Sequence, residues 1–197
     1  MTSGLRERKK QATRLALHEA ALHLVAERGL DGVSVDDIAE RADVSPRTFF
    51  NYFPAKDDAV LGLDETDHDR LVAAFLARPA GESPLQALRA VARDQAAGMA
   101  EETDLWPLRM RVIDAHPALL GRLSASFGRA ETAMARAIAQ RTGTSAHDVL
   151  PVLLAGVAGV AMRTALHRWL ATDFTASLPD LVDEAWELLA KGLPAPR

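Results

Sequence analysis

Two short helices separated by a tight turn are predicted between Val33 and Lys56, in the stretch VSVDDIAERADVSPRTFFNYFPAK. Ser34 precedes an apolar-periodic run and Asp37 follows three residues later, which indicates a capping-box-like start for the first helix. Ser45 and Pro46 indicate a second start, because serine caps a helix and proline at the first helical position loses no hydrogen bond. Helices paired in this way form a helix-turn-helix unit, whose second helix enters the major groove of DNA.

The second predicted helix, ended by Pro54, divides into an inner and an outer face. Phe49 and Phe53 lie four residues apart and share a face, which we assign to the core of a three-helix domain. The outer face carries an arginine suited to guanine, an asparagine suited to adenine, and hydroxyls that reach phosphates. These residues are Arg47, Asn51, Thr48 and Tyr52. A solvated helix surface is the alternative interpretation.

Further groups suited to DNA lie outside this helix. Lys56 stands near the positive N-terminal end of the next helix, which favours phosphate binding. A basic cluster near the N-terminus also suits phosphate contact, although such a cluster alone is often only a solvated terminus. It consists of Arg6, Arg8, Lys9, Lys10 and Arg14. The predicted DNA-binding set is Ser34, Ser45, Pro46, Arg47, Thr48, Asn51, Tyr52 and Lys56.

The formal net charge of −4 argues only weakly against DNA binding. Residues 1–57 contain nine basic and nine acidic side chains, whereas residues 58–197 contain fourteen basic and eighteen acidic ones. The chain has no cysteine, which excludes disulfides, thiolate metal sites and cysteine nucleophiles. No signal peptide is found, and no uncharged apolar run approaches the length of a membrane span. We therefore expect a cytoplasmic protein that is neither exported nor embedded in a membrane.

The remaining sequence predicts more helices and no strands, so the fold is expected to be all-α with about nine helices. A helix before the motif ends at Gly29, a residue suited to a helix C-terminus. A single long helix is predicted to follow the motif from Lys56 to Ala77. The other predicted helices span about residues 6–28, 85–101, 105–114, 117–141, 146–172 and 179–191. We expect a helix-turn-helix domain over 1–55 and a helical domain over 56–197.

The front quarter of the sequence resembles the TetR family of bacterial transcriptional regulators. The resemblance lies in many positions at fixed spacing, namely Ala20-Ala21, Leu24, Glu27-Arg28-Gly29, Val33, Val35, Ile38-Ala39, Ala42, Val44-Ser45, Thr48-Phe49, Tyr52-Phe53 and Lys56. The rest resembles the C-terminal domain of the mycofactocin-regulator subgroup, which is predicted to sense acyl-CoA-like ligands. That resemblance lies in residues 108–111, 116–119, 165–170 and 181–185.

The family resemblance implies a homodimer, a ligand cavity in the C-terminal domain, and release of operator DNA when a small molecule binds. One position departs from the family. TetR relatives usually carry a tyrosine at the position of Phe50, whose hydroxyl contacts a phosphate, and phenylalanine cannot donate that hydrogen bond. The hydroxyl of Tyr52 is a possible substitute, and Phe50 either packs or contacts DNA through a thymine methyl.

Two further sets of residues are predicted for the C-terminal domain. Cavities in helical proteins are lined mainly by apolar and aromatic groups with a few polar ones, although each such residue also suits a plain core. The candidate ligand-binding residues are Phe75, Trp106, Arg109, Met110, Ile113, Phe127, Met134, Met162 and Arg163. Gly156 and Gly159 indicate close backbone approach in the helix over 146–172. The candidate dimer residues, which burial in one subunit would also explain, are Leu153, Val157, Val160, Leu181, Ala185, Trp186, Leu188 and Leu189.

No catalytic constellation, metal site or cofactor is predicted. His18 and His23 are five residues apart, whereas a zinc-binding helix needs two histidines four apart. Asp64 and His68 have metal-pair spacing, but a solvated acidic helix face explains them better. The leading hypothesis is a DNA-binding regulator, a repressor released from a palindromic operator by a small hydrophobic or acyl-type ligand, with the helix from Lys56 as the lever. The alternative is a helical small-molecule or lipid-binding protein without sequence-specific DNA binding.

Overall fold

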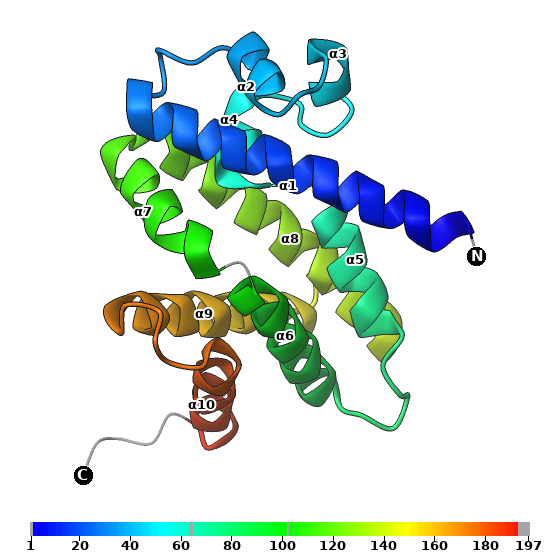
Figure 1. The fold of residues 1–197 in the computed structure, drawn as a ribbon. Helices are drawn as coiled ribbons and strands as arrows, with labels where there is room; N and C mark the ends of the chain where they lie inside the picture. The colour runs from blue at the N-terminus through cyan, green and yellow to red at the C-terminus, as the bar shows by residue number, and fades with distance from the viewer. Residues whose placement is uncertain (1, 64, 102, 193–197) are drawn as a thin grey trace. The chain divides into compact units, whose positions relative to one another are not determined.

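The computed structural model describes residues 2–63, 65–101 and 103–192, and within these ranges it is all-helical (Figure 1). The α-helices are α1 (Thr2–Arg28), α2 (Val35–Arg41), α3 (Pro46–Phe49), α4 (Lys56–Leu61), α5 (Glu65–Leu76), α6 (Pro84–Glu101), α7 (Trp106–Ala115), α8 (Ala118–Thr142), α9 (Val149–Ala171) and α10 (Leu178–Ala190), with a 3-10 turn at Thr103–Leu105. The chain divides into two compact units. The first contains the residues up to 65 together with 104–126, and the second contains 66–103 together with the residues from 127 onward.

The prediction of one long helix from Lys56 to Ala77 is wrong. Gly62 adopts φ +64°, a left-handed conformation that ends α4, and the N–H of Leu63 donates to the Asp58 carbonyl at 2.9 Å. This arrangement is typical of a glycine-terminated helix, because glycine has no Cβ to oppose a positive φ. A separate helix, α5, begins at Glu65. No single rod therefore runs from Lys56 into the second unit.

Helix α3 is also shorter than predicted. It covers Pro46–Phe49, and residues 50–52 continue as turns rather than as helix. The turns still place Phe53 on the inner face, because its N–H donates to the Phe49 carbonyl at 3.0 Å. Phe49 and Phe53 are both completely buried. Their predicted place in the core of the first unit is confirmed.

The core of the first unit joins α1, α2, α3 and α4 to α7 and to the start of α8. Apolar side chains spaced along α1 form one side of it, as the sequence pattern predicts. The fully buried residues include Leu17, Ala21, Leu24, Ile38, Phe49, Phe53, Val60 and Leu119. The helix-turn-helix therefore rests on a scaffold that includes residues more than 50 positions away in the chain.

The C-terminal end of α4 is held by basic side chains from two other helices of the first unit. The Arg14 guanidinium of α1 donates to the Gly62 carbonyl at 2.8 Å, and Arg109 of α7 donates to the Leu61 carbonyl. His18 of α1 places Nδ1 2.7 Å from the Ala59 carbonyl. The carbonyls at a helix C-terminus lack partners within the helix, so these side chains satisfy them. A Cβ at position 62 would lie 3.0 Å from the His18 ring, so glycine there also leaves room for the histidine.

An ion pair fixes the other side of α4. Asp58 is buried, with 6% of its surface exposed, and both carboxylate oxygens accept hydrogen bonds of 2.6 Å from Arg122 of α8. These bonds raise the pKa of Arg122 above its usual value. A bidentate arginine–carboxylate pair is directional as well as strong. It therefore orients α4 against α8 within the first unit.

Replacing Arg122 by alanine is expected to lower the free energy of unfolding by about 2 kcal/mol, because the Asp58 carboxylate would be left buried without its partner. The value lies below that of a fully buried pair because the Arg122 side chain is 40% exposed. Urea denaturation measures the change. The double variant Asp58→Asn with Arg122→Ala is the control and should recover part of the loss. Equal stability of wild type and Arg122→Ala would contradict this role.

The second unit is built around α6, α9 and α10, which pack on one another. Trp169 and Trp186 are buried in it, and the indole N–H of Trp169 donates to the Ala176 carbonyl at 3.0 Å. Arg89 and Arg93 of α6 both pair with Asp183 of α10. Helix α9 is long and apolar enough to cross a membrane by length and composition alone, with a mean hydropathy of 1.9. A single helix of this kind is weak evidence for a membrane span, and α9 packs on α6 and α10.

Candidate functional site

Hydrogen bonds between side chains and backbone fix the start of α2 and α3. The Ser34 hydroxyl accepts from the Asp37 N–H at 3.1 Å, and the Asp37 carboxylate accepts from the Ser34 N–H at 2.8 Å, which completes the predicted capping box. Hydrogen bonds from Ser34 lower the pKa of the Asp37 carboxyl. At α3 the Ser45 hydroxyl accepts from the Thr48 N–H at 3.1 Å, and Pro46 occupies the first turn. Both predicted helix starts are confirmed.

The Ser45→Ala substitution is expected to lower the free energy of unfolding by about 1 kcal/mol, because one N–H at the start of α3 loses its acceptor. Thr48 would also lose the 2.8 Å contact between its hydroxyl and that of Ser45. Thermal unfolding measures the effect. Ser45→Asp is a matched control that restores a capping oxygen. If the alanine variant were as stable as wild type, the cap would not stabilise α3.

The outer surface of this region presents mixed polar, charged and aromatic groups. Arg47, Asn51 and Phe50 are exposed, and Phe50 keeps 58% of its surface in solvent although its ring lies edge-on to Phe49 at 5.4 Å. Among the described residues, Arg47 takes part in no ion pair. Tyr52 differs from the prediction, because it is half-buried and packs against the core of the first unit. Arg47 and Asn51 of the predicted DNA-binding set are therefore exposed, as is Phe50, and base contacts by them stay a prediction.

Lys56 makes hydrogen bonds to the backbone that were not predicted from the sequence. Its ammonium donates to the carbonyls of Leu30 at 2.6 Å and Val33 at 2.9 Å, and so ties the start of α4 to the turn before α2. Only the fold brings these carbonyls near Lys56, because they lie 23 and 26 positions away in the chain. A phosphate contact by Lys56 stays a prediction. Two of the three ammonium N–H groups are already engaged.

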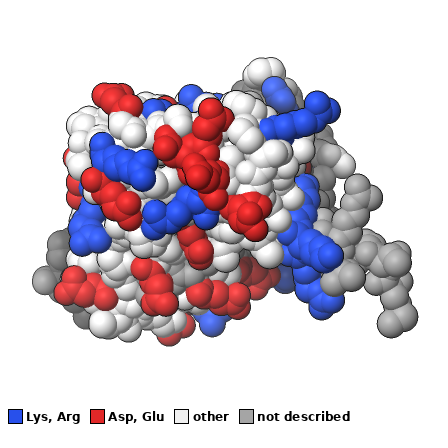
Figure 2. All heavy atoms as spheres, turned by 45° about the horizontal axis from the view of Figure 1, so that its top comes forward, with Lys and Arg blue, Asp and Glu red and all other residues white. Residues whose placement is uncertain are grey.

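Figure 2 shows acidic and basic side chains interspersed over much of one face, with several basic side chains together at its right-hand side. Near the helix-turn-helix the acids are partly neutralised, since Asp37 pairs with Arg28 at 3.2 Å and Glu27 pairs with Arg41 at 3.5 Å. Arg8, Lys9 and Lys10 of the predicted basic cluster are exposed on α1, whereas the side chain of Arg6 lies outside the described ones. These two ion pairs partly offset the acidic side chains beside the helix-turn-helix.

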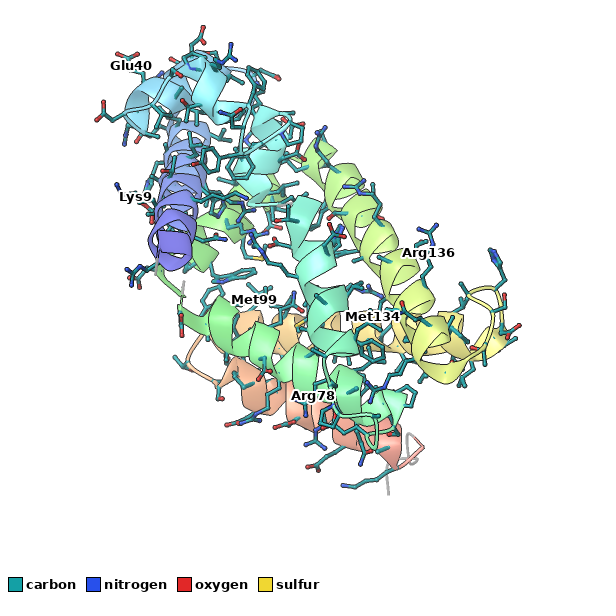
Figure 3. All side chains as sticks on the ribbon, turned by 90° about the vertical axis from the view of Figure 1, so that its right-hand side faces the viewer. Lys9, Glu40, Arg78, Met99, Met134 and Arg136 are labelled. Atoms are coloured by element: carbon teal, nitrogen blue, oxygen red, sulfur yellow. The ribbon has the colours of Figure 1, made fainter. Side chains whose placement is uncertain are left out.

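A cavity of about 140 Å³ lies within the second unit. Helices α5, α6, α8 and α9 contribute side chains to it, and most of these are apolar. The lining residues are His68, Leu71, Leu88, Val91, Ala92, Gln95, Phe127, Ala130, Glu131, Met134, Ala155, Ala158, Gly159, Met162, Arg163 and Leu166. Figure 3 labels Met134 of α8, which lines the cavity, and Arg136 of the same helix, which is exposed.

The structure brings together four of the nine predicted ligand residues. Phe127, Met134, Met162 and Arg163 line the cavity. Phe75 is buried in the second unit with the Arg141 guanidinium 5.5 Å from its ring centre, and it does not line this cavity. The other four, Trp106, Arg109, Met110 and Ile113, lie on α7 in the first unit, where the Arg109 guanidinium stacks 4.7 Å from the Trp106 ring centre. Glu131 and His68 also line the cavity, but they were not among the predicted ligand-binding residues.

The two glycines of α9 differ in what surrounds them within the chain. A Cβ at Gly156 would meet nothing within 4 Å, so no backbone approaches it within the chain. A Cβ at Gly159 would lie 2.6 Å from a Glu131 carboxylate oxygen, so the close neighbour is a side chain rather than another helix backbone. Within the chain neither glycine lies against another helix backbone, and close approach of α9 to a second copy stays a prediction. Gly159 makes room in the cavity wall.

The predicted dimer residues fall into two groups. Leu153 and Val160 of α9 and Leu188 of α10 are exposed although they are apolar. Val157, Leu181, Ala185 and Leu189 are half-buried, and Trp186 is buried within its own unit, where it supports α10 rather than offering a free surface. The sequence missed Val149 and Val152, which are exposed on the same helix as Leu153. In the part of the chain that the structure describes, no group of three His, Cys, Asp or Glu residues could hold a metal ion, and Asp64 lies outside it.

Two parts of the chain match known protein families. Residues 17–61 match the family of bacterial regulatory proteins of the tetR type, and residues 82–194 match the MftR C-terminal domain. The first match contains the helix-turn-helix, and the second contains most of the residues that line the cavity.

Individual relatives agree with these matches. TcmR of Streptomyces glaucescens, an HTH-type transcriptional regulator, is 37% identical over 151 residues, which cover 74% of this chain and 67% of TcmR. MftR of Mycobacterium tuberculosis, named for the regulation of mycofactocin biosynthesis, is 30% identical over 188 residues, which cover 94% of this chain and 93% of MftR. The FadR structure of Bacillus subtilis has the same fold, with a TM-score of 0.56 at 18% identity over 91% of this chain and 99% of that chain. The chain belongs to the TetR family of DNA-binding bacterial transcriptional regulators, which are not enzymes, and it carries an MftR-type C-terminal domain.

Proposed function

We propose that this regulator acts in the cytoplasm as a homodimeric repressor that leaves a palindromic operator when a small hydrophobic or acyl-type ligand binds. The observation that carries the proposal is the capped helix α3 with the turn that follows it, which together expose Arg47 and Asn51 while Phe49 and Phe53 are buried. The buried rings fix the position of the helix, and the exposed groups match the hydrogen-bonding patterns of guanine and adenine. A rigid base-reading surface of this kind is what operator recognition needs.

Exposed apolar residues on α9 support the homodimer. Val149 keeps 80% of its surface in solvent, Leu153 keeps 57% and Val160 keeps 50%. These residues, together with Val152 and Gly156, recur at helical spacing and share one side of α9. A second copy of α9 would remove this surface from water, and the absence of a Cβ at Gly156 would let two helices approach closely. Two subunits would then present two copies of α3 to successive major grooves.

The cavity supports ligand control. Its walls come from α5, α6, α8 and α9 of the second unit, and a ligand that fits it would favour whichever arrangement of those helices suits the ligand best. Release from DNA requires that the ligand bind the DNA-free arrangement more tightly than the DNA-bound one. The break at Gly62 replaces the predicted single lever with two short helices. Coupling would then pass through α4, which Arg14, His18, Arg109 and Arg122 hold.

Selection from a pool of random duplexes tests this proposal and yields the operator sequence in the same experiment. The expected product is a palindrome whose half-site centres are about 34–36 Å apart, one helical turn of DNA, or a multiple of that distance. Light scattering of the free and DNA-bound protein should show an even number of subunits on each site. A pool with no enriched sequence, or enrichment of single half-sites bound by monomers, would contradict the homodimeric mode.

A further inference from the structure

One ion pair lies in the wall of the cavity, between Glu131 of α8 and Arg163 of α9 (the Glu131–Arg163 pair). The Arg163 Nη1 donates to a Glu131 carboxylate oxygen at 3.2 Å. Apart from His68, these are the ionisable side chains among the lining residues. The two side chains are 44% and 38% exposed, and water screens pairs of this kind so that they add little to stability. A charged ligand can therefore displace one partner at small cost.

Of the two partners, Glu131 is held less firmly. The Arg163 guanidinium also lies 5.9 Å from the centre of the Phe127 ring, a position in which a cation is attracted to the aromatic face. Within the described ranges, Glu131 makes no other hydrogen bond. The guanidinium has five N–H donors, and its bond to Glu131 uses one of them. A ligand that replaces Glu131 would therefore find Arg163 already positioned, with donors to spare.

Gly159 determines where the Glu131 carboxylate lies. A Cβ at position 159 would be 2.6 Å from the Glu131 oxygen and 3.1 Å from Arg163 Nη1. The carboxylate therefore occupies space that any other residue at 159 would fill with its side chain. Since the nearest atom is the end of a flexible side chain, an added methyl would push the carboxylate aside rather than disrupt α9. The Glu131 carboxylate and the Arg163 guanidinium therefore lie close together but are easily separated.

The size of the cavity limits how much of a ligand can lie inside it. A dry protein cavity of about 150 Å³ is known to accept benzene, and this cavity measures about 140 Å³. Its walls are supplied mainly by Leu, Val, Ala and Met side chains. The apolar part of a fitting ligand is therefore about one ring or six carbon atoms. Arg163 is the one strong cation among the described lining residues. It therefore favours a ligand that carries an anionic group at one end.

We infer that Arg163 anchors the acid group of a small organic acid, whose apolar part fills the cavity, and that this acid displaces Glu131. The inference rests on the proposed function, because it names the chemical class of the effector and its anchor. The carboxylate of the ligand would accept two parallel hydrogen bonds from the guanidinium, a geometry that the single bond to Glu131 does not use. Glu131 would turn toward solvent and leave Arg163 paired with the ligand.

Three probes of one shape but different charge test the inference on the full-length chain. Phenylacetate, 2-phenylethanol and 2-phenylethylammonium each present one ring, and isothermal titration calorimetry gives the dissociation constant of each. Phenylacetate is expected to bind at least about tenfold more tightly than the alcohol, because charged hydrogen bonds are stronger than neutral ones. The ammonium compound is expected to bind most weakly. Equal or tighter binding of the ammonium compound would overturn the inference, as would a failure of phenylacetate to bind.

Substitutions then identify the anchor. Arg163→Met is expected to weaken phenylacetate binding by roughly 10- to 100-fold and to leave the alcohol unchanged. Glu131→Gln should tighten phenylacetate binding by about tenfold, because the competing negative charge is gone. Arg136→Met is the matched control, since Arg136 is exposed on α8 and does not line the cavity. Circular dichroism shows whether each variant is folded.

An unchanged dissociation constant for phenylacetate in Arg163→Met would overturn the anchor role. Operator binding by the unliganded protein is measured separately and separates the two proposals. If phenylacetate binds through Arg163 but the chain selects no DNA, the proposed repressor function fails and the acid site stands. If the chain selects an operator but no probe binds, the acid site fails and the DNA-binding role stands.

Discussion

Replacing Arg47 by alanine is expected to weaken binding to the selected operator by about 30-fold to 20,000-fold. A bidentate arginine–guanine contact contributes about 1–3 kcal/mol of discrimination, and a dimer would make that contact twice. The loss should be sequence-specific, so binding to unrelated duplex should change little. Fluorescence anisotropy with operator and with scrambled duplex measures both quantities. Stability should not change, because Arg47 is exposed and takes part in no ion pair among the described residues.

The matched control is Arg136→Ala, which removes the same charge from an exposed site on α8 of the second unit. This control should reduce operator affinity only slightly, by the loss of general electrostatic attraction. Arg47→Lys is a second comparison, since lysine keeps the charge but loses the planar fork of arginine. If Arg47→Ala bound the operator as tightly as wild type, α3 would not read bases through this residue.

Acidification from pH 6.5 to pH 4 is expected to lower the free energy of unfolding by about 3 kcal/mol through His18 alone. Burial lowers the pKa of His18 from 6.5 to about 4, and the positive charge of Arg109 adds to the effect. The unfolded chain therefore binds a proton below pH 6.5, whereas the folded chain binds it only near pH 4. Protonation thus favours the unfolded state, and stability falls through this window as the pH is lowered.

Carboxylates such as Asp37, whose pKa is also lowered in the folded state, change stability in the same direction, so the His18 contribution has to be isolated. The comparison is between wild type and His18→Gln, with urea denaturation at a series of pH values. The variant is expected to lose about 3 kcal/mol of the pH dependence, whatever its stability at pH 7. His23→Gln is the control because His23 is exposed on the same helix. An identical pH dependence in wild type and His18→Gln would contradict the assignment.

Local signals in the sequence predicted the features that depend on nearby residues. Ser34, Ser45 and Pro46 act within three positions of themselves, so their pattern was sufficient to place α2 and α3. The spacing of Phe49 and Phe53 was sufficient to place both in the core. The end of α4 was missed because Gly62 is a single glycine in an apolar-periodic run, and a positive φ is favoured there by the packing of His18 and Arg14 from a distant part of the chain.

Features that depend on distant residues were harder to predict. Lys56 was assigned to DNA phosphate, but the fold brings the Leu30 and Val33 carbonyls to its ammonium. Arg109 and Arg163 were equivalent in the sequence, since each is an arginine in an apolar helix. The structure separates them, because Arg109 holds the end of α4 and Arg163 lines the cavity. Glu131 was not predicted to line the cavity, because an acidic residue on an amphipathic helix is ordinarily solvated.

The most direct test of the central claim is binding to the DNA immediately upstream of the chain's own gene across a salt series. Gel shift with that DNA and with scrambled duplex gives the affinity and its salt dependence together. Selective binding is expected to weaken steeply as salt rises, because phosphate contacts release counterions, and Arg47→Ala is expected to remove the selectivity. A chain that shows no salt-dependent, sequence-selective shift, with Arg47→Ala indistinguishable from wild type, would contradict the account.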